Sequence, residues 1–224
     1  KAFRKNIENG IRKKGETLYK IFQFALKVAY KYNGSGFDKG KGLKIFLKPL
    51  LWIFDKILFK KIRDGFGGKI EFFIGGGALL DVELQRFFFA IGMPVCQGYG
   101  LTEASPVISS NTPIDIKFGS SGKLVKYLDL KILDNDGKEL PQGQKGEIVV
   151  KGDNVMLGYW NNPTATAETI KDGWLHTGDI VTVDDGGYIK IVDRLKDMII
   201  VSGFNVYPNE LEQVLTTHEH VSQC

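Results

Sequence analysis

A strand–helix–strand pattern in the middle of the chain constrains the fold more than any other feature of the sequence. GKIEFFIGGG (68–77) is a short apolar segment that ends in three glycines, and MPVCQGYG (93–100) is a second apolar segment. The residues between them predict a helix, with Asp81 as its N-cap and Gly92 at its C-terminal end. Two strands joined by a helix in so short a span form a βαβ unit with parallel strands. The sequence therefore predicts an α/β fold.

The ends of the two predicted strands indicate a candidate binding site. Parallel strands end at the same edge of a sheet, and open parallel sheets bind ligands outside that edge. After the second strand, the segment QGYGLTEASPV (97–107) places the hydroxyl of Thr102 beside the carboxylate of Glu103. These two groups suit a phosphate and its metal ion. The alternative interpretation is a strand, a turn and a capped helix without a ligand.

The second half of the chain has the pattern of a mainly β region. Short apolar strands alternate with turns over residues 118–192, with a pair of strands around the turn at 135–137 and a hairpin that turns at 184–187. This pattern predicts a small β-barrel or sandwich, with a short helix that begins near Pro163. A strand, a turn and a helix near Pro208 then indicate the start of another domain.

The first part of the chain is basic and predicts two helices. Helical apolar spacing covers residues 5–32 and 43–63, on either side of a glycine-rich break. Residues 1–70 contain 18 Lys and Arg against 5 Asp and Glu, whereas the remainder contains 12 against 21. The lysines are either solvated on packed helices or face an anionic surface such as a membrane. Nucleic acid is disfavoured as a partner, because no aromatic stacking platform is interleaved with the basic residues.

Composition and pattern together divide the chain into four expected parts. Hydrophobic residues make up 43% and charged residues 25%, as in a globular protein. With only Cys96 and Cys224, a disulfide framework is excluded and a reducing compartment is favoured. Because the chain starts with Lys1 and stops soon after a helix begins, we expect it to be a piece of a longer protein. The expected parts are a basic helical segment (1–66), a parallel βαβ portion (67–117), a β-barrel subdomain (118–193), and a hinge with the start of a C-terminal domain (194–224).

Two further residues have the chemistry of a nucleotide site. Asp179 follows a Thr-Gly turn in WLHTGD, where a carboxylate can accept two sugar hydroxyls. Arg194 in VDRLKD can reach the same sugar or a phosphate with its planar guanidinium. Together with Thr102, Glu103 and the glycines after the first strand, these residues would hold a nucleotide. His176, also in WLHTGD, retains a structural interpretation.

Five motifs occur in the order found in adenylate-forming, or AMP-binding, enzymes: IGGGALL, QGYGLTEASPV, GEIVVKGDNVMLGYW, GWLHTGDI and VDRLKDMIIVSGFNVYPNELE. Over residues 68–224 the chain resembles a long-chain fatty-acid–CoA ligase of that superfamily. The fatty-acid subgroup rests on LTEASPV, VSGFNVYPNE and the two basic helices. The resemblance implies the rear of a large N-terminal domain, with a parallel sheet and a small β-barrel, followed by the start of a small C-terminal α+β domain.

The resemblance also implies an ATP-dependent ligase that works in two steps. A fatty-acid carboxylate attacks the α-phosphate of ATP to give an acyl-adenylate and pyrophosphate, and the thiol of CoA then displaces AMP. The implied cofactors and substrates are ATP, Mg²⁺, CoA and a long-chain fatty acid. The resemblance further implies a cytoplasmic location. We also expect residues 1–63 to make peripheral contact with the inner face of a membrane. The family's phosphate loop and catalytic lysine are expected outside this chain, so we expect the chain alone to be inactive.

Individual roles carry over from the family to matching positions of this sequence. For the nucleotide and its metal, the implied residues are Gly76, Gly77 and Ala78 at the adenine wall, Tyr99 stacked on adenine with Gln97 and Gly100 beside it, Thr102 on a phosphate, Glu103 on magnesium, Asp179 on ribose, and Arg194 on ribose and phosphate. Lys196 would be the hinge of the C-terminal domain rather than the catalytic lysine. Gly203 would lie beside the pantetheine tunnel for CoA.

The sequence leaves two other functions open. The same fold can activate another acid or serve another acceptor, such as an aryl or medium-chain acid or an acyl-carrier protein. A relative without catalytic activity could bind a nucleotide and carry out no chemistry. The presence of Thr102, Glu103, Asp179 and Arg194 together argues against this last option.

Overall fold

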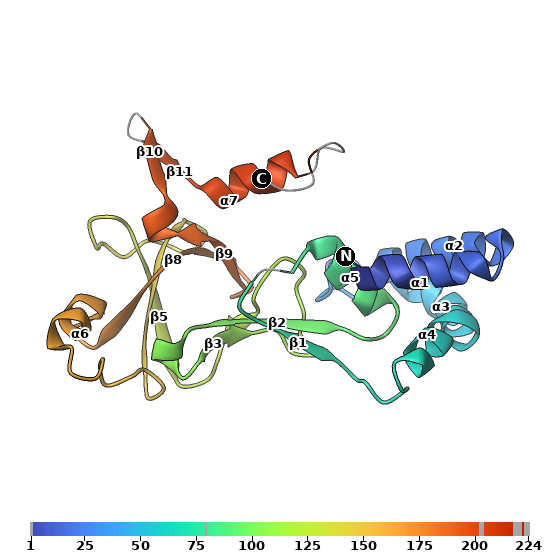
Figure 1. Cartoon of the computed structure of the whole chain (residues 1–224), viewed down its shortest axis with the longest axis horizontal. Coiled ribbons are helices and arrows are strands. Elements are labelled where there is room, and N and C mark those ends of the chain that lie inside the picture. Colours follow the sequence, from blue (N-terminus) through green and yellow to red (C-terminus); the bar gives the residue numbers. More distant parts are fainter. Residues whose placement is uncertain (1, 79, 202–203, 217–220, 222–224) are drawn as a thin grey trace. The chain divides into compact units, whose positions relative to one another are not determined.

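The computed structural model describes residues 2–78, 80–201, 204–216 and 221. The chain forms two compact units, which are Lys1–Gly98 with Asn111–Gly119 (unit 1) and Tyr99–Ser110 with Ser120–Cys224 (unit 2). Unit 1 is mainly helical and unit 2 mainly β (Figure 1). Helices occur together with parallel and antiparallel strands, so the predicted α/β class is confirmed. The division into four parts stays a prediction.

Unit 1 begins with two helices where the sequence predicted one. α1 (Ala2–Lys13) and α2 (Glu16–Asn33) are separated at Gly15, whose φ of 137° is strained for any residue with a Cβ atom. The prediction of a single helix over residues 5–32 is therefore wrong. The glycine-rich break that follows α2 is confirmed, because residues 34–40 form turns and an isolated bridge there.

The second helical pattern is confirmed as a run of short helical segments. They are the 3-10 helix η1 (Gly42–Leu47), α3 (Lys48–Phe54), the π-helical turn η2 (Asp55–Phe59) and α4 (Lys60–Gly65). Pro49 lies in the first turn of α3, where its missing N–H costs no helical hydrogen bond. The buried face of these helices contributes Phe59 to a core that also contains Phe22 of α2.

The predicted βαβ unit is confirmed. β1 (Phe73–Gly75) pairs in parallel with β2 (Val95–Gly100), and α5 (Val82–Ala90) connects them. The backbone N–H of Leu84 donates to Asp81 Oδ1 at 2.9 Å, so Asp81 caps α5 as expected. Phe87 of α5 is fully buried in the same core as Phe22, which fixes the helix in unit 1.

Unit 2 is built around an antiparallel sheet with the strand order β5-β6-β8-β7, and β9 pairs with β8. The predicted hairpin is confirmed, because β8 and β9 pair on either side of residues 184–187. After the turn at 135–137 the structure has only an isolated bridge between Leu133 and Glu139 in place of the second predicted strand. Among the described residues no strand pair closes the sheet into a barrel. The elements of this part are β3 (Val107–Ser110), β4 (Lys123–Leu124), β5 (Leu128–Leu133), β6 (Gly146–Gly152), α6 (Pro163–Thr169), β7 (Ile170–Lys171), β8 (Trp174–Val183) and β9 (Ile189–Arg194).

The last part of unit 2 contains a short hairpin and a helix. β10 (Ile199–Val201) pairs with β11 (Phe204–Val206), and α7 (Pro208–Leu215) begins at the predicted proline. Over the part of the chain that the structure describes, every helix is too short or too polar to cross a membrane.

Candidate functional site

The chain reverses sharply where β2 ends, and this turn carries the first candidate residues. A Cβ atom on Gly100 would lie 1.8 Å from the carbonyl oxygen of Pro106, so only glycine fits there. The N–H of Leu101 donates to the same carbonyl at 2.8 Å. The 3-10 turn η3 (Thr102–Ala104) lies in the loop between Leu101 and Pro106 that these contacts close. The turn therefore places Thr102 and Glu103 directly after a strand, as the sequence predicted.

Glu103 is held by a residue that the sequence analysis did not identify. Its Oε1 atom accepts a hydrogen bond of 2.8 Å from the phenol of Tyr159. That hydrogen bond, followed by burial, raises the pKa of the Tyr159 phenol. Thr102 is exposed beside this pair. A hydroxyl and a carboxylate are thus available at the end of β2.

Asp179 lies in a second group of polar side chains within unit 2. The phenol of Tyr99 donates to Asp179 Oδ2 at 2.7 Å, and Arg194 Nε lies 3.5 Å from Asp179 Oδ1. Burial raises the pKa of the Asp179 carboxyl, and the hydrogen bond from Tyr99 and the charge of Arg194 oppose that rise. Burial, followed by the charge of Asp179, raises the pKa of the Tyr99 phenol. The structure therefore brings together three of the residues expected at the nucleotide.

The desolvated carboxylate of Asp179 has the chemistry of a sugar-binding group. An ionised carboxylate can accept about four hydrogen bonds, and Tyr99 uses one of them. Hydroxyl donors from a ligand could use the remaining acceptor sites of this half-buried carboxylate. Arg194 is mostly exposed, which leaves its guanidinium able to contact a ligand as well.

The residues expected at the adenine wall lie in unit 1. Gly76, Gly77 and Ala78 are exposed in the loop after β1. The side-chain amide of Gln97 donates to the carbonyl of Ala78 at 2.9 Å and accepts from the N–H of Leu80 at 3.3 Å. Because Gln97 is only 2% exposed and both ends of its amide are used, these contacts favour a role in supporting the loop.

The hinge region contains contacts that the sequence analysis also missed. Lys196 is exposed in the 3-10 turn η4 (Leu195–Asp197). Nearby, the buried carboxylate of Asp193 accepts hydrogen bonds from the backbone N–H and the side-chain amide of Asn209, at 3.0 and 2.8 Å. Asp193 therefore satisfies a free N–H in the first turn of α7. Gly203, expected at the CoA tunnel, lies outside the described residues.

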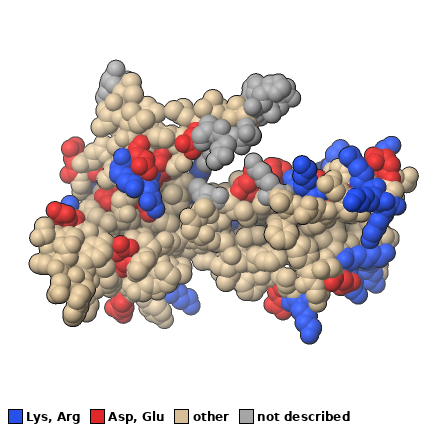
Figure 2. All heavy atoms as spheres, viewed as in Figure 1, with Lys and Arg blue, Asp and Glu red and all other residues tan. Residues whose placement is uncertain are grey.

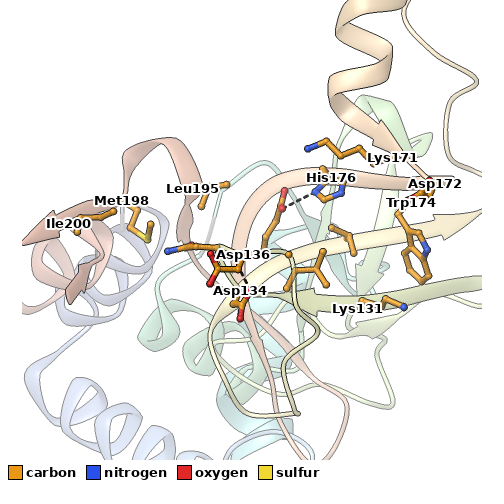
Figure 3. A pocket seen from close by; sticks show the side chains of 15 residues that line it. Lys131, Asp134, Asp136, Lys171, Asp172, Trp174, His176, Leu195, Met198 and Ile200 are labelled. Atoms are coloured by element: carbon orange, nitrogen blue, oxygen red, sulfur yellow. Dashed lines mark hydrogen bonds and ion pairs between the residues drawn. The ribbon is translucent and has the colours of Figure 1, made fainter. Parts of the chain in front are cut away.

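His176 lies in a cavity that contains none of the expected nucleotide residues. Its Nδ1 atom is 2.9 Å from Glu147 Oε2, and the N–H of Gly178 donates to Glu147 Oε1 at 3.0 Å. The cavity has a volume of about 890 Å³ and is also lined by Trp174 and Asp136 (Figure 3). Glu147 thus binds the side chain and the backbone of the WLHTGD segment, which supports the structural interpretation of His176.

The described residues suit magnesium only when it arrives with phosphates. No group of three or more His, Cys, Asp or Glu side chains that could hold a metal occurs in the described part of the chain. Magnesium usually binds one or two carboxylates, substrate phosphates and waters, so one carboxylate beside a hydroxyl is a sufficient protein contribution. Glu103 and Thr102 fit this requirement, since the hydrogen bond from Tyr159 occupies only one carboxylate oxygen.

Comparison with known proteins identifies the family. A sequence model described as AMP-binding enzyme matches residues 22–160, more than half of the chain. The chain belongs to the AMP-binding enzyme family. It is 51% identical over 151 residues to a long-chain-fatty-acid–CoA ligase of Escherichia coli O6:H1, which corresponds to 66% of this chain and 27% of the relative. It is also 45% identical over 151 residues to a feruloyl-CoA synthase of an Amycolatopsis species, covering 66% of this chain and 31% of that protein.

Solved structures of other AMP-binding enzymes have the same fold. One is the O-succinylbenzoate coenzyme A synthetase of Bacillus subtilis in complex with ATP and magnesium ion, with 37% identity and a TM-score of 0.62. That match covers 68% of this chain and 32% of the synthetase. This chain thus spans about a third or less of the length of these three relatives.

Proposed function

We propose that the protein containing this chain activates a long-chain fatty acid with ATP and transfers the acyl group to CoA. The observation that carries the proposal is the combination of the Tyr99–Asp179–Arg194 group with 51% identity to a long-chain-fatty-acid–CoA ligase. The reaction has two steps. The fatty-acid carboxylate displaces pyrophosphate from the α-phosphate of ATP, and the thiol of CoA then displaces AMP and gives the thioester.

Residues of β2, β8, β9 and the loop after β1 would bind the nucleotide during the first step. Asp179 would accept hydrogen bonds from the ribose hydroxyls, Arg194 would contact ribose and phosphate, and Tyr99 would stack on adenine. Gly76, Gly77 and Ala78 would form the adenine wall, Gln97 would support that loop, and Gly100 would permit the turn that leads to the phosphates.

Negative charge on the phosphates is the main electrostatic barrier to the first step. Thr102 would donate its hydroxyl to a phosphate oxygen, and Glu103 would hold magnesium. Magnesium, when bound, stabilises the charge that develops at phosphorus and on the leaving pyrophosphate. Both side chains come from one short turn, which reduces the freedom they lose on binding.

The second step would require the C-terminal part to change its orientation about Lys196. The exposed position of Lys196 in η4, between β9 and β10, supports this role. Gly203 would then lie beside the CoA tunnel. The hydrogen bonds between Asp193 and Asn209 would hold α7 in its present orientation. They would have to break for the C-terminal part to reorient.

Activity on another acid is the second candidate, because a feruloyl-CoA synthase is 45% identical over the same length. The test is to supply the complete protein with ATP, magnesium, CoA and a palmitate, octanoate or ferulate substrate. We expect palmitoyl-CoA to form with the highest kcat/KM. Preference for ferulate would contradict the fatty-acid assignment while leaving the ligase chemistry in place.

Replacing Asp179 with alanine is expected to weaken binding of ATP and AMP by about 10- to 150-fold. Both nucleotides carry the ribose, and a hydrogen bond to a charged group contributes roughly 1.5–3 kcal/mol. Isothermal titration calorimetry on the complete protein measures both affinities. Asp129→Ala is the control, because Asp129 is an exposed carboxylate on β5 away from this group. Unchanged AMP affinity in Asp179→Ala would remove the ribose assignment.

A peripheral contact between residues 1–63 and an anionic membrane surface is proposed as well. Lys and Arg side chains gather over the helices of unit 1 (Figure 2). Large apolar side chains are exposed among them, including Phe46 at 77% and Trp52 at 60%. The Lys56 ammonium lies 3.8 Å from the centre of the Trp52 ring. Aromatic side chains beside lysines are typical of helices that lie on a bilayer surface, and a cytoplasmic location would present them to anionic lipids.

The protein is expected to float with phosphatidylglycerol vesicles and much less with phosphatidylcholine vesicles. Each basic residue near an anionic surface contributes about 1 kcal/mol, and salt screens this attraction. A flotation assay at low and high salt measures the effect, with the Phe46→Ser, Trp52→Ser double variant expected to bind less. Equal binding to the two kinds of vesicle would favour lysines that are simply solvated.

A further inference from the structure

Tyr159 and Glu103 lie far apart in the sequence and meet in the structure. The phenol of Tyr159 donates to Glu103 Oε1 at 2.8 Å across 56 positions of the chain. Tyr159 precedes α6, whereas Glu103 lies in the turn after β2. In the described part of the chain, this phenol donates to the Glu103 carboxylate. The contact thus joins two segments of unit 2 at the proposed metal ligand.

The position of Tyr159 is itself fixed by the start of α6. The N–H of Tyr159 donates to Thr166 Oγ1 at 2.9 Å, and the Thr166 hydroxyl donates to the carbonyl of Asn162 at 2.8 Å. Asn162 caps α6 by accepting from the N–H of Ala165 at 3.1 Å. Gly158 has a φ of 153°, and a Cβ atom there would lie 2.7 Å from Thr166 Cγ2. The tyrosine therefore extends from a well-determined turn.

The same segment also holds the backbone around Glu103. The N–H of Met156 donates to the carbonyl of Glu103 at 2.8 Å. The side-chain amide of Asn154 donates to the carbonyls of Ala104 and Val107, at 2.7 and 3.1 Å. Residues 154–159 thus bind both the backbone and the carboxylate of the turn. Backbone contacts fix where the turn lies, and the phenol adds control over how the carboxylate is oriented.

We propose that Tyr159 is a positioning residue that orients the Glu103 carboxylate for magnesium. This inference rests on the proposed function, which assigns Glu103 to the metal. A donor on Oε1 limits rotation of the carboxylate and leaves Oε2 for the ion. Groups that orient metal ligands typically contribute 10- to 100-fold to metal affinity or activity. Tyr159 would thus contribute to metal binding without contacting the nucleotide.

The test compares Tyr159→Phe with the unaltered complete protein in a binding assay that needs no turnover. Mn²⁺ replaces magnesium, a non-hydrolysable ATP analogue fills the nucleotide site, and electron paramagnetic resonance measures free Mn²⁺. We expect Tyr159→Phe to weaken Mn²⁺ binding by about 10-fold or more. Trp160→Phe is the matched control, since Trp160 is the exposed next residue and we expect no change. Thermal unfolding checks that both variants are folded.

A double-variant comparison separates an effect through Glu103 from a general effect on the loop. If Tyr159 acts through Glu103, adding Tyr159→Phe to Glu103→Gln should not weaken Mn²⁺ binding further. Thr166→Val keeps the phenol but removes the acceptor of the Tyr159 N–H, and we expect weaker Mn²⁺ binding there too. The inference would be overturned if both Tyr159→Phe and Thr166→Val bound Mn²⁺ within about twofold of the affinity of the unaltered protein. Unchanged affinity in Glu103→Gln would instead overturn the metal assignment itself, and the inference with it.

Discussion

Glu103→Gln is expected to slow adenylate formation by about 100-fold or more while the protein stays folded. Glutamine retains a carbonyl oxygen that can accept the hydrogen bond from Tyr159, so the contact at 2.8 Å can persist. What the variant loses is the negative charge that we propose holds magnesium. A metal ion supplies several kcal/mol of stabilisation to a phosphoryl transition state, and about 3 kcal/mol corresponds to roughly 150-fold in rate.

ATP–pyrophosphate exchange with palmitate measures this step directly. The control is Glu139→Gln, which removes a carboxylate of unit 2 whose partner is Lys131 at the surface, 3.1 Å away. We expect the control to exchange at the normal rate, because an exposed ion pair contributes little to stability. Glu103 is not the magnesium ligand if its glutamine variant also exchanges at that rate.

Local sequence signals predicted much of unit 1. Asp81 at the start of α5 is a residue whose side chain can cap a helix, and the structure has that hydrogen bond. The two apolar segments around α5 were short enough to require strands, and they pair in parallel. Such features depend on neighbours within a few residues, which is why a sequence reveals them.

The boundary between α1 and α2 was missed because both helices pack apolar residues against the same core. Ile7 and Ile11 of α1 and Leu18 of α2 all pack against the cluster that contains Phe22. The helical spacing of apolar residues therefore continues across Gly15. Periodicity alone does not reveal the break between the two helices at this residue. In unit 2 the sequence predicted short strands, and the structure has them. Whether such strands close into a barrel depends on pairing between strands that are distant in the sequence.

The candidate site depends still more on contacts between distant residues. Tyr99 and Asp179 are 80 positions apart, and nothing in their spacing predicts a hydrogen bond of 2.7 Å. The resemblance to a family placed both residues at one expected nucleotide site, and the structure shows the hydrogen bond between them. Tyr159 lies in the motif GEIVVKGDNVMLGYW, but no role was assigned to it, because its hydroxyl meets Glu103 only after α6 fixes the turn.

The 224-residue chain by itself is expected to make no acyl-CoA, although it could retain weak AMP binding. The carboxylate proposed to bind ribose, Asp179, and the arginine beside it, Arg194, both lie among its described residues in unit 2. The chain covers only 27% of the long-chain-fatty-acid–CoA ligase that it resembles. The phosphate loop and the catalytic lysine that the family resemblance implies are expected outside this chain. Contacts made only in the transition state set the rate of the chemical step, so binding can survive where turnover does not.

The measurement is to incubate the chain with ATP, magnesium, CoA and palmitate and to look for palmitoyl-CoA by mass spectrometry. The complete protein serves as the positive control, and calorimetry with AMP shows whether the ribose group is still formed in the isolated chain. AMP binding without product would support the division of roles between this chain and the rest of the protein. Repeated turnover by the chain alone would mean that the groups that activate the α-phosphate lie among its own residues, which would contradict the expectation that they lie outside this chain.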